Sequence, residues 1–163
     1  MNILLVYPQY PTTFWSFKYA LKFIAKKASL PPLGLLTVSA MLPAHWQQRL
    51  IDLNVRKITD ADLRWADYVL LSAMSIQKAS ADAVIDQCRH LGVAVIAGGP
   101  LFTAHPEDYT HVDHLVLNEA EITLPQFLTD LQQGRAQHLY ASPQWADLSV
   151  TPAPRFDLLD MQK

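Results

Sequence analysis

Short apolar runs alternate with segments of helical periodicity along most of this 163-residue chain, and that alternation limits its fold more than any other feature. A strand that feeds a helix and then a parallel strand of the same sheet does so with one handedness, which covers both faces of the sheet with helices. The apolar runs predict five strands, at Ile3–Tyr7, Arg49–Leu53, Tyr68–Ala73, Val93–Ala97 and His114–Leu117.

Apolar residues at helical spacing fill the gaps between these strands. They predict helices at Leu33–Leu42, Asp60–Trp65 and 76–91, a short helix near Thr103, and a last helix from Ile122 that ends before Gly134. We therefore expect an α/β protein of flavodoxin-like (Rossmann-like) type, with a doubly wound five-stranded parallel sheet in the order 2-1-3-4-5.

Composition excludes several classes of protein. The net charge of −2 argues against a nucleic-acid partner, which usually leaves a basic footprint. The lone cysteine, Cys88, excludes a disulfide framework or a cysteine-ligated cluster within this chain. No segment approaches the roughly 20 apolar residues of a membrane span, and Met1–Pro8 lacks the basic start of a signal peptide, so we expect a cytoplasmic protein.

Small and polar residues follow the predicted strands, where open α/β sheets bind ligands. The fourth strand ends in Gly98-Gly99-Pro100, which we interpret as a flat wall beside a ligand. Ser72 and Ser75 flank the turn after the third strand, and Glu119 follows the fifth. The alternatives are that Ser75 caps the next helix, that Asp52 caps the helix from Asp60, and that Glu119 and Glu121 only complement a helix dipole.

No catalytic set is evident in the sequence. The six histidines show no metal-ligand spacing, and there is no G-x-S-x-G nucleophile motif. A receiver domain needs acidic residues where this chain has Tyr7-Pro8 and Ser72-Ala73. The chain alone is therefore predicted to have neither catalytic activity nor a metal site, which leaves a ligand-binding module or an interaction domain as the two hypotheses.

Several short motifs occur in a characteristic order over about residues 1–133. They are Tyr7-Pro8, Pro31-Pro32-Leu33-Gly34-Leu35-Leu36, Asp52, Ser72, Gly98-Gly99-Pro100, Thr103 and Glu119-Ala120-Glu121. This order resembles the N-terminal cobalamin-binding domain of class B radical S-adenosylmethionine enzymes, in the branch that includes hopanoid methylases.

The resemblance implies that the corrin ring of cobalamin lies over the carboxyl edge of the sheet and that its nucleotide tail passes between the third and fourth strands. The residues it assigns to the cofactor are Tyr7, Pro8, Asp52, Asn54, Ser72, Ala73, Met74, Ser75, Gly98, Gly99, Pro100, Thr103, Glu119 and Ala120. The alternative is a flavodoxin-like interaction domain that does not bind cobalamin.

The sequence differs from the motifs of related cobalamin-binding proteins at several positions, and these differences bear on how cobalamin would bind. Asp52-x-Asn54-x-x-Lys57 stands where methionine-synthase-type domains have D-x-H-x-x-G, so cobalamin is expected base-off or without a histidine ligand from this protein. Asn118 replaces a usual glycine, and Leu101 and Phe102 replace His and Pro. The family's C-x-x-x-C-x-x-C motif is missing, so S-adenosylmethionine and a 4Fe-4S cluster are expected only in a C-terminal radical domain, which would act with this module in methyl transfer.

Two regions lie outside the alternating pattern of a domain at 1–134. Residues 10–28 form an aromatic and basic insertion with lysines at helical spacing. It is interpreted as a flap or docking surface, as a membrane-surface helix that meets a lipid substrate, as a homodimer contact, or as a simple peripheral helix. Residues 135–163 lose strand and helix patterning and are expected to be a linker towards the radical domain, or else a tail that packs back.

Overall fold

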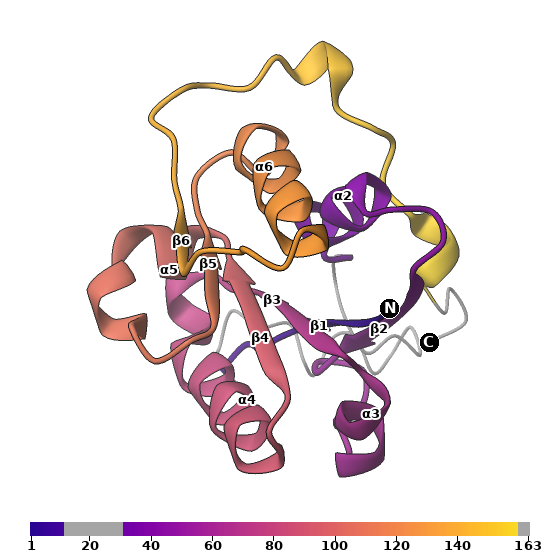
Figure 1. Ribbon diagram of the computed structural model, residues 1–163. Coiled ribbons are helices and arrows are strands. Elements are labelled where there is room, and N and C mark those ends of the chain that lie inside the picture. Colours follow the sequence, from indigo (N-terminus) through magenta and orange to yellow (C-terminus); the bar gives the residue numbers. More distant parts are fainter. Residues whose placement is uncertain (12–30, 160–163) are drawn as a thin grey trace.

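In the computed structural model, which describes residues 1–11 and 31–159, the strands form a single parallel sheet (Figure 1). The strands are β1 (Asn2–Tyr7), β2 (Gln47–Asp52), β3 (Tyr68–Ser72), β4 (Ala94–Gly98), β5 (His114–Val116) and β6 (Leu139–Tyr140). Their order is β2-β1-β3-β4-β5-β6. The predicted fold class and the order 2-1-3-4-5 are therefore confirmed, because each strand pairs in parallel with its expected neighbour.

The prediction of only five strands is wrong, because β6 adds a sixth at the edge beside β5. It lies in the region expected to lack strands, and its two residues are too few to show an apolar run or an alternation. Its position is set by tertiary contacts: the Leu117 amide donates to the Tyr140 carbonyl at 2.8 Å. The Tyr140 hydroxyl, which is buried, donates to Asp130 at 3.0 Å and accepts from the Gln137 amide at 2.9 Å.

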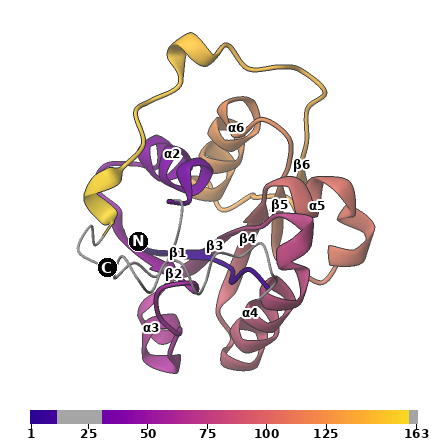
Figure 2. The same cartoon turned by 180° about the vertical axis from the view of Figure 1, so that it is seen from behind.

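Helices cover both faces of the sheet (Figures 1 and 2). The helices are α2 (Leu33–Met41), α3 (Asp60–Trp65), α4 (Lys78–Leu91), α5 (Pro100–Ala104) and α6 (Ala120–Gln132), with short turns η2 (Ser75–Gln77), η3 (Pro106–Tyr109), η4 (Leu148–Val150) and η5 (Phe156–Leu158). Alternate residues of β1 point to opposite faces, so Leu4 and Val6 pack with α3 and α4, whereas Ile3 and Leu5 pack with α2 and α6.

The sequence predicts the residue that ends α4 but not the residue that caps α3. Gly92 ends α4 in the left-handed conformation, with φ of 69°. Thr59 begins α3 in a reciprocal capping box with Asp62, and the neighbouring Arg56 guanidinium lowers the pKa of that carboxyl to about 2. The interpretation of Asp52 as the cap of this helix is therefore wrong, since Thr59 occupies that position.

After β6 the chain passes over α6 and reaches α2 (Figures 1 and 2). The Arg155 amide donates to the Leu36 carbonyl at 3.1 Å, and Leu158 packs against the apolar layer under α2 and α6. This part of residues 135–159 therefore packs back on the domain. Its role as a linker towards another domain stays a prediction.

The aromatic and basic insertion falls mainly on residues 12–30, outside the described part of the chain, so its roles as flap, membrane contact or dimer contact stay predictions. Among the helices of the described residues, none has the length and apolar character needed to cross a membrane.

If the Tyr140 hydroxyl anchors the sixth strand, Tyr140→Phe will lower the free energy of unfolding by about 1–3 kcal/mol, because it removes two hydrogen bonds, one of them to the buried Asp130 carboxylate. Urea denaturation with an unchanged m-value measures this loss. An unfolding midpoint equal to that of the wild type would contradict the role of this hydroxyl.

Candidate functional site

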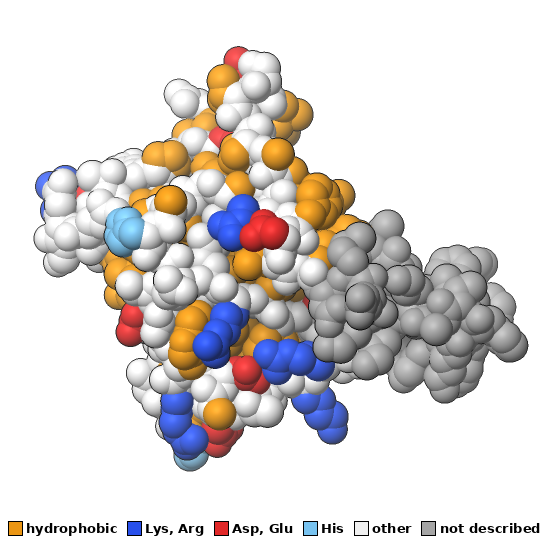
Figure 3. Space-filling model, turned by 90° about the vertical axis from the view of Figure 1, so that its right-hand side faces the viewer, with side chains coloured by type: hydrophobic (Ala, Val, Ile, Leu, Met, Phe, Trp, Pro, Cys, Tyr) orange, Lys and Arg blue, Asp and Glu red, His pale blue; other side chains and the backbone are white. Residues whose placement is uncertain are grey.

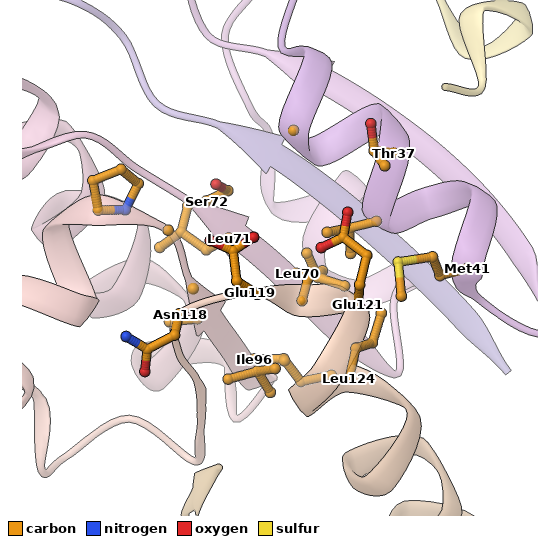
Figure 4. A pocket seen from close by; sticks show the side chains of 18 of the residues that line it. Thr37, Met41, Leu70, Leu71, Ser72, Ile96, Asn118, Glu119, Glu121 and Leu124 are labelled. Carbon is orange, nitrogen blue, oxygen red and sulfur yellow. The ribbon is translucent and has the colours of Figure 1, made fainter. Parts of the chain in front are cut away.

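A largely apolar cavity of about 430 Å³ opens at the carboxyl ends of β3, β4 and β5 (Figure 4). Leu70 and Ile96 of the sheet line its floor, and Leu124 of α6 lines one side. Thr37 and Met41 approach from α2, and the first turn of α6 closes the remaining side (Figure 4). A concave apolar cavity with a few polar groups at its rim is the usual form of a small-molecule site.

Six of the residues predicted to bind a ligand line this cavity. They are Ser72, Gly98, Gly99, Pro100, Glu119 and Ala120. They come from the ends of three adjacent parallel strands, which the sheet order brings to one edge. The sequence predicts one crevice at the ends of the second to fifth strands, and the structure forms a cavity at the ends of β3, β4 and β5 without β2. It lies at the carboxyl edge of the sheet, the edge where open α/β sheets bind ligands.

The two glycines are required by the protein's own backbone. A Cβ on Gly98 would lie 2.6 Å from the carbonyl oxygen of Val116 in β5. Gly99 has φ of 88°, and a Cβ there would lie 2.8 Å from the hydroxyl oxygen of Ser72. Their lack of side chains lets β5 and Ser72 approach closely, so the flat wall predicted from the sequence also holds neighbouring elements in place.

Asn118, at the turn between β5 and α6, takes the left-handed conformation with φ of 62°. Asparagine tolerates this conformation better than other residues with a Cβ, which explains how it can replace a glycine here. The backbone N–H of Asn118 donates a hydrogen bond to the Thr103 hydroxyl at 3.1 Å. Thr103 is outside the cavity lining and supports the turn from behind, while Leu101 and Phe102 are buried in the core on the α4 face.

A second group of the predicted residues surrounds Pro8 instead of the cavity. The Pro8 carbonyl accepts hydrogen bonds from the Gln77 side chain at 2.6 Å and from the Asn54 side chain at 3.3 Å. Asn54 also accepts from the Tyr10 amide at 2.9 Å. Both ends of the Asn54 amide are thus engaged in holding the loop after β1.

Asp52 belongs to this second group. Its carboxylate accepts from the backbone and side-chain nitrogens of Asn54 at 2.8 and 2.7 Å. Burial raises the pKa of Asp52, and these hydrogen bonds oppose that shift. Asp52 follows the edge strand β2, which β1 separates from β3, so it is distant in the sheet order from the strands that line the cavity.

Tyr7, which is partly buried, and Met74, which is exposed, complete this group. The hydroxyls of Tyr7 and Tyr10 lie 2.6 Å apart, and that of Tyr10 donates to the Met74 sulfur at 3.4 Å. Burial and the neighbouring Tyr10 hydroxyl raise the pKa of Tyr7. Met74 and Tyr10 are partly exposed, so they present a polarizable surface at the carboxyl edge of the sheet.

Ala73 and Ser75 line neither region. Ala73 is buried and accepts a backbone hydrogen bond from Leu101 at 3.0 Å. Ser75 is exposed at the start of η2, and the expected cap by its hydroxyl is wrong: Gln77 closes this turn by accepting from the Met74 amide at 2.9 Å.

Sequence reasoning missed the contributions of α2 and of the segment after β6. Gly34, Thr37, Val38 and Met41 line the cavity from α2, and Leu148 and Thr151 line it from η4 and the residue after it. The α2 sequence is apolar at nearly every position, so its periodicity does not show which face of the helix lines a cavity. The available signal was Gly34 and Thr37, small and polar residues one turn apart.

The fold and the cavity define a doubly wound α/β ligand-binding domain. The family model described as the B12 binding domain matches residues 24–128 of the chain, so the chain belongs to this family. The position of the cavity at the carboxyl edge of the sheet agrees with that assignment.

Two longer proteins are similar to almost the whole chain. One is an uncharacterized methyltransferase of Synechocystis sp., 39% identical over 163 residues, or 99% of this chain and 30% of the relative. The other is the hopanoid C-2 methylase of Rhodopseudomonas palustris, 30% identical over 167 residues, or 99% of this chain and 32% of the relative. The chain therefore spans about a third of the length of these curated relatives.

Alanine substitutions at two glycines of the cavity lining test whether the missing Cβ is required by a neighbouring backbone atom. Gly98→Ala places a Cβ against the Val116 carbonyl and will lower the free energy of unfolding by about 1–3 kcal/mol. Gly34→Ala meets no atom within 4 Å and will leave stability within about 1 kcal/mol of the wild type. Urea denaturation of both variants tests the difference, and equal unfolding midpoints would contradict it.

Proposed function

We propose that this chain is the cobalamin-carrying module of a larger radical S-adenosylmethionine methyltransferase and that its cavity holds the nucleotide tail of the cofactor. The observation that carries this proposal is the apolar cavity at the ends of β3, β4 and β5 in a chain of the B12-binding family.

The chemistry of the lining fits the tail. Cobalamin's tail ends in a planar aromatic base, which suits an apolar floor such as Leu70 and Ile96. Ser72 supplies a hydroxyl at the rim, and Glu119 supplies a hydrogen-bond acceptor beside it.

The corrin ring is assigned to the carboxyl edge outside the cavity, beside Tyr10 and Met74. Asn54 offers no replacement for a histidine ligand to cobalt, because an amide nitrogen is a poor donor and this amide already bonds to Pro8 and Asp52. Asn54 and the loop after β1 that it holds are therefore assigned to positioning the ring, and neither is assigned to binding the cobalt. Bound cobalamin supplies a cobalt centre that can carry a methyl group.

The rest of the reaction is assigned to segments that lie beyond the matched third of the longer relatives. The relatives are about three times as long, and both carry names of methyl-transferring enzymes. We assign residues 1–134 to the cofactor module and residues 135–163 to the approach to a C-terminal radical domain, which would hold S-adenosylmethionine and a 4Fe-4S cluster. A cytoplasmic location is part of the same proposal.

Retention of hydroxocobalamin tests this function directly. The purified 163-residue chain, mixed with hydroxocobalamin and desalted, is expected to keep the visible absorbance of the corrin ring. Gly34→Trp adds a large side chain to the cavity lining and will weaken retention roughly tenfold or more, equivalent to about 1.4 kcal/mol.

The matched control is Gln132→Trp at the exposed end of α6, which is outside the cavity lining and will bind like the wild type. A folded wild-type chain that keeps no corrin absorbance would refute the proposal and favour an interaction domain.

A further inference from the structure

The segment that follows β6 crosses the mouth of the cavity. We call residues 141–155 the strap. In Figures 1 and 2 it leaves β6, arches over α6 and descends at α2. In Figure 3 the top of the molecule, which the strap forms, projects beyond the body and carries hydrophobic side chains.

The strap is fixed at its two ends. Tyr140 holds the first end through β6 and its hydrogen bonds to Asp130 and Gln137. Arg155 holds the second end through the 3.1 Å backbone hydrogen bond to Leu36 of α2. Between these anchors the Thr151 hydroxyl donates to the Glu121 carboxylate at 2.9 Å.

The middle of the strap faces the cavity with little packing of its own. Leu148 and Thr151 are part of the cavity lining. Leu148 is nevertheless 72% exposed, and its neighbours Val150 and Trp145 are 74% and 88% exposed. Removing an apolar side chain from water lowers the free energy. An apolar group in the cavity would therefore be stabilised by covering Leu148, which the domain alone leaves exposed to solvent.

From this arrangement we infer that the strap is part of the binding site: it closes over the nucleotide tail and distinguishes cobalamin from corrinoids that lack the tail. This inference rests on the proposed function. Glu121 positions Thr151, the hydrogen bond between them holds the strap across the mouth, and Leu148 packs against the occupant. The corrin ring, assigned to the edge beyond the cavity, is outside the reach of this contact.

The test compares two probes, hydroxocobalamin and aquocobinamide, which has the corrin ring without the nucleotide tail. Thr151→Val removes the hydroxyl at similar volume and will weaken hydroxocobalamin binding roughly three- to tenfold, as expected for the loss of one hydrogen bond. Its affinity for aquocobinamide will stay within twofold of the wild type. Visible-absorbance titrations give both dissociation constants.

Three further variants make the comparison specific. Thr151→Ser keeps a hydroxyl and will bind both probes like the wild type. Leu148→Ala will weaken hydroxocobalamin alone. Thr129→Val is the matched control, because the Thr129 hydroxyl also donates a hydrogen bond, to the Pro125 carbonyl at 2.9 Å, but lies outside the cavity lining.

Chymotrypsin cleavage after Trp145 gives an independent measurement on the wild type. Closure of the strap predicts slower cleavage with hydroxocobalamin and an unchanged rate with aquocobinamide. Faster cleavage with hydroxocobalamin would overturn the inference, because it would show that the tail displaces the strap.

The outcomes separate the two proposals. A wild-type chain that binds neither probe refutes the proposed function itself. A wild-type chain that binds both, with Thr151→Val changing both affinities equally or neither, overturns the role of the strap and leaves cobalamin carriage intact.

Discussion

The rest of the structure depends on the close approach of β4 and β5 at their carboxyl ends. The space for that approach exists because Gly98 has no Cβ to meet the Val116 carbonyl, and Gly99 follows in a left-handed conformation that few other residues adopt. After β5 the chain turns at Asn118, and α6 begins at Ala120. The opening between that helix and α2, above β3 and β4, is the cavity.

The polar residues at the strand ends divide into two structural roles. Asn54 and Gln77 hold the loop after β1 by hydrogen bonds to Pro8, and their polar atoms are engaged within the protein. Ser72 and Glu119 instead line the cavity. The strand ends therefore supply one set of polar groups that stabilises a loop and another that faces the cavity of this B12-binding-family domain.

The segment after β6 changes how the domain is understood. It contributes a strand, contacts α2 through Arg155 and places Thr151 beside Glu121 at the mouth of the cavity. With these contacts, the segment forms part of the cavity wall. The proposed closure over a nucleotide tail would make the exposure of this segment depend on whether the cavity is occupied.

The sequence by itself determined the α/β class and the parallel sheet, because hydrophobic periodicity and the handedness of strand-helix-strand units depend only on residues close together in the chain. The order of the first five strands was predicted from the doubly wound fold that this alternation indicates. The sequence also predicted one crevice at the ends of β2, β3, β4 and β5, and the structure brings only the last three of these ends together around the cavity. Only the tertiary structure decided that Asn54 supports Pro8, that Gly98 accommodates Val116, and that Thr37 and Thr151 face the same cavity. These relations join residues far apart in the chain, and β6 is too short to signal its partner locally, so each depends on how the helices and the strap pack.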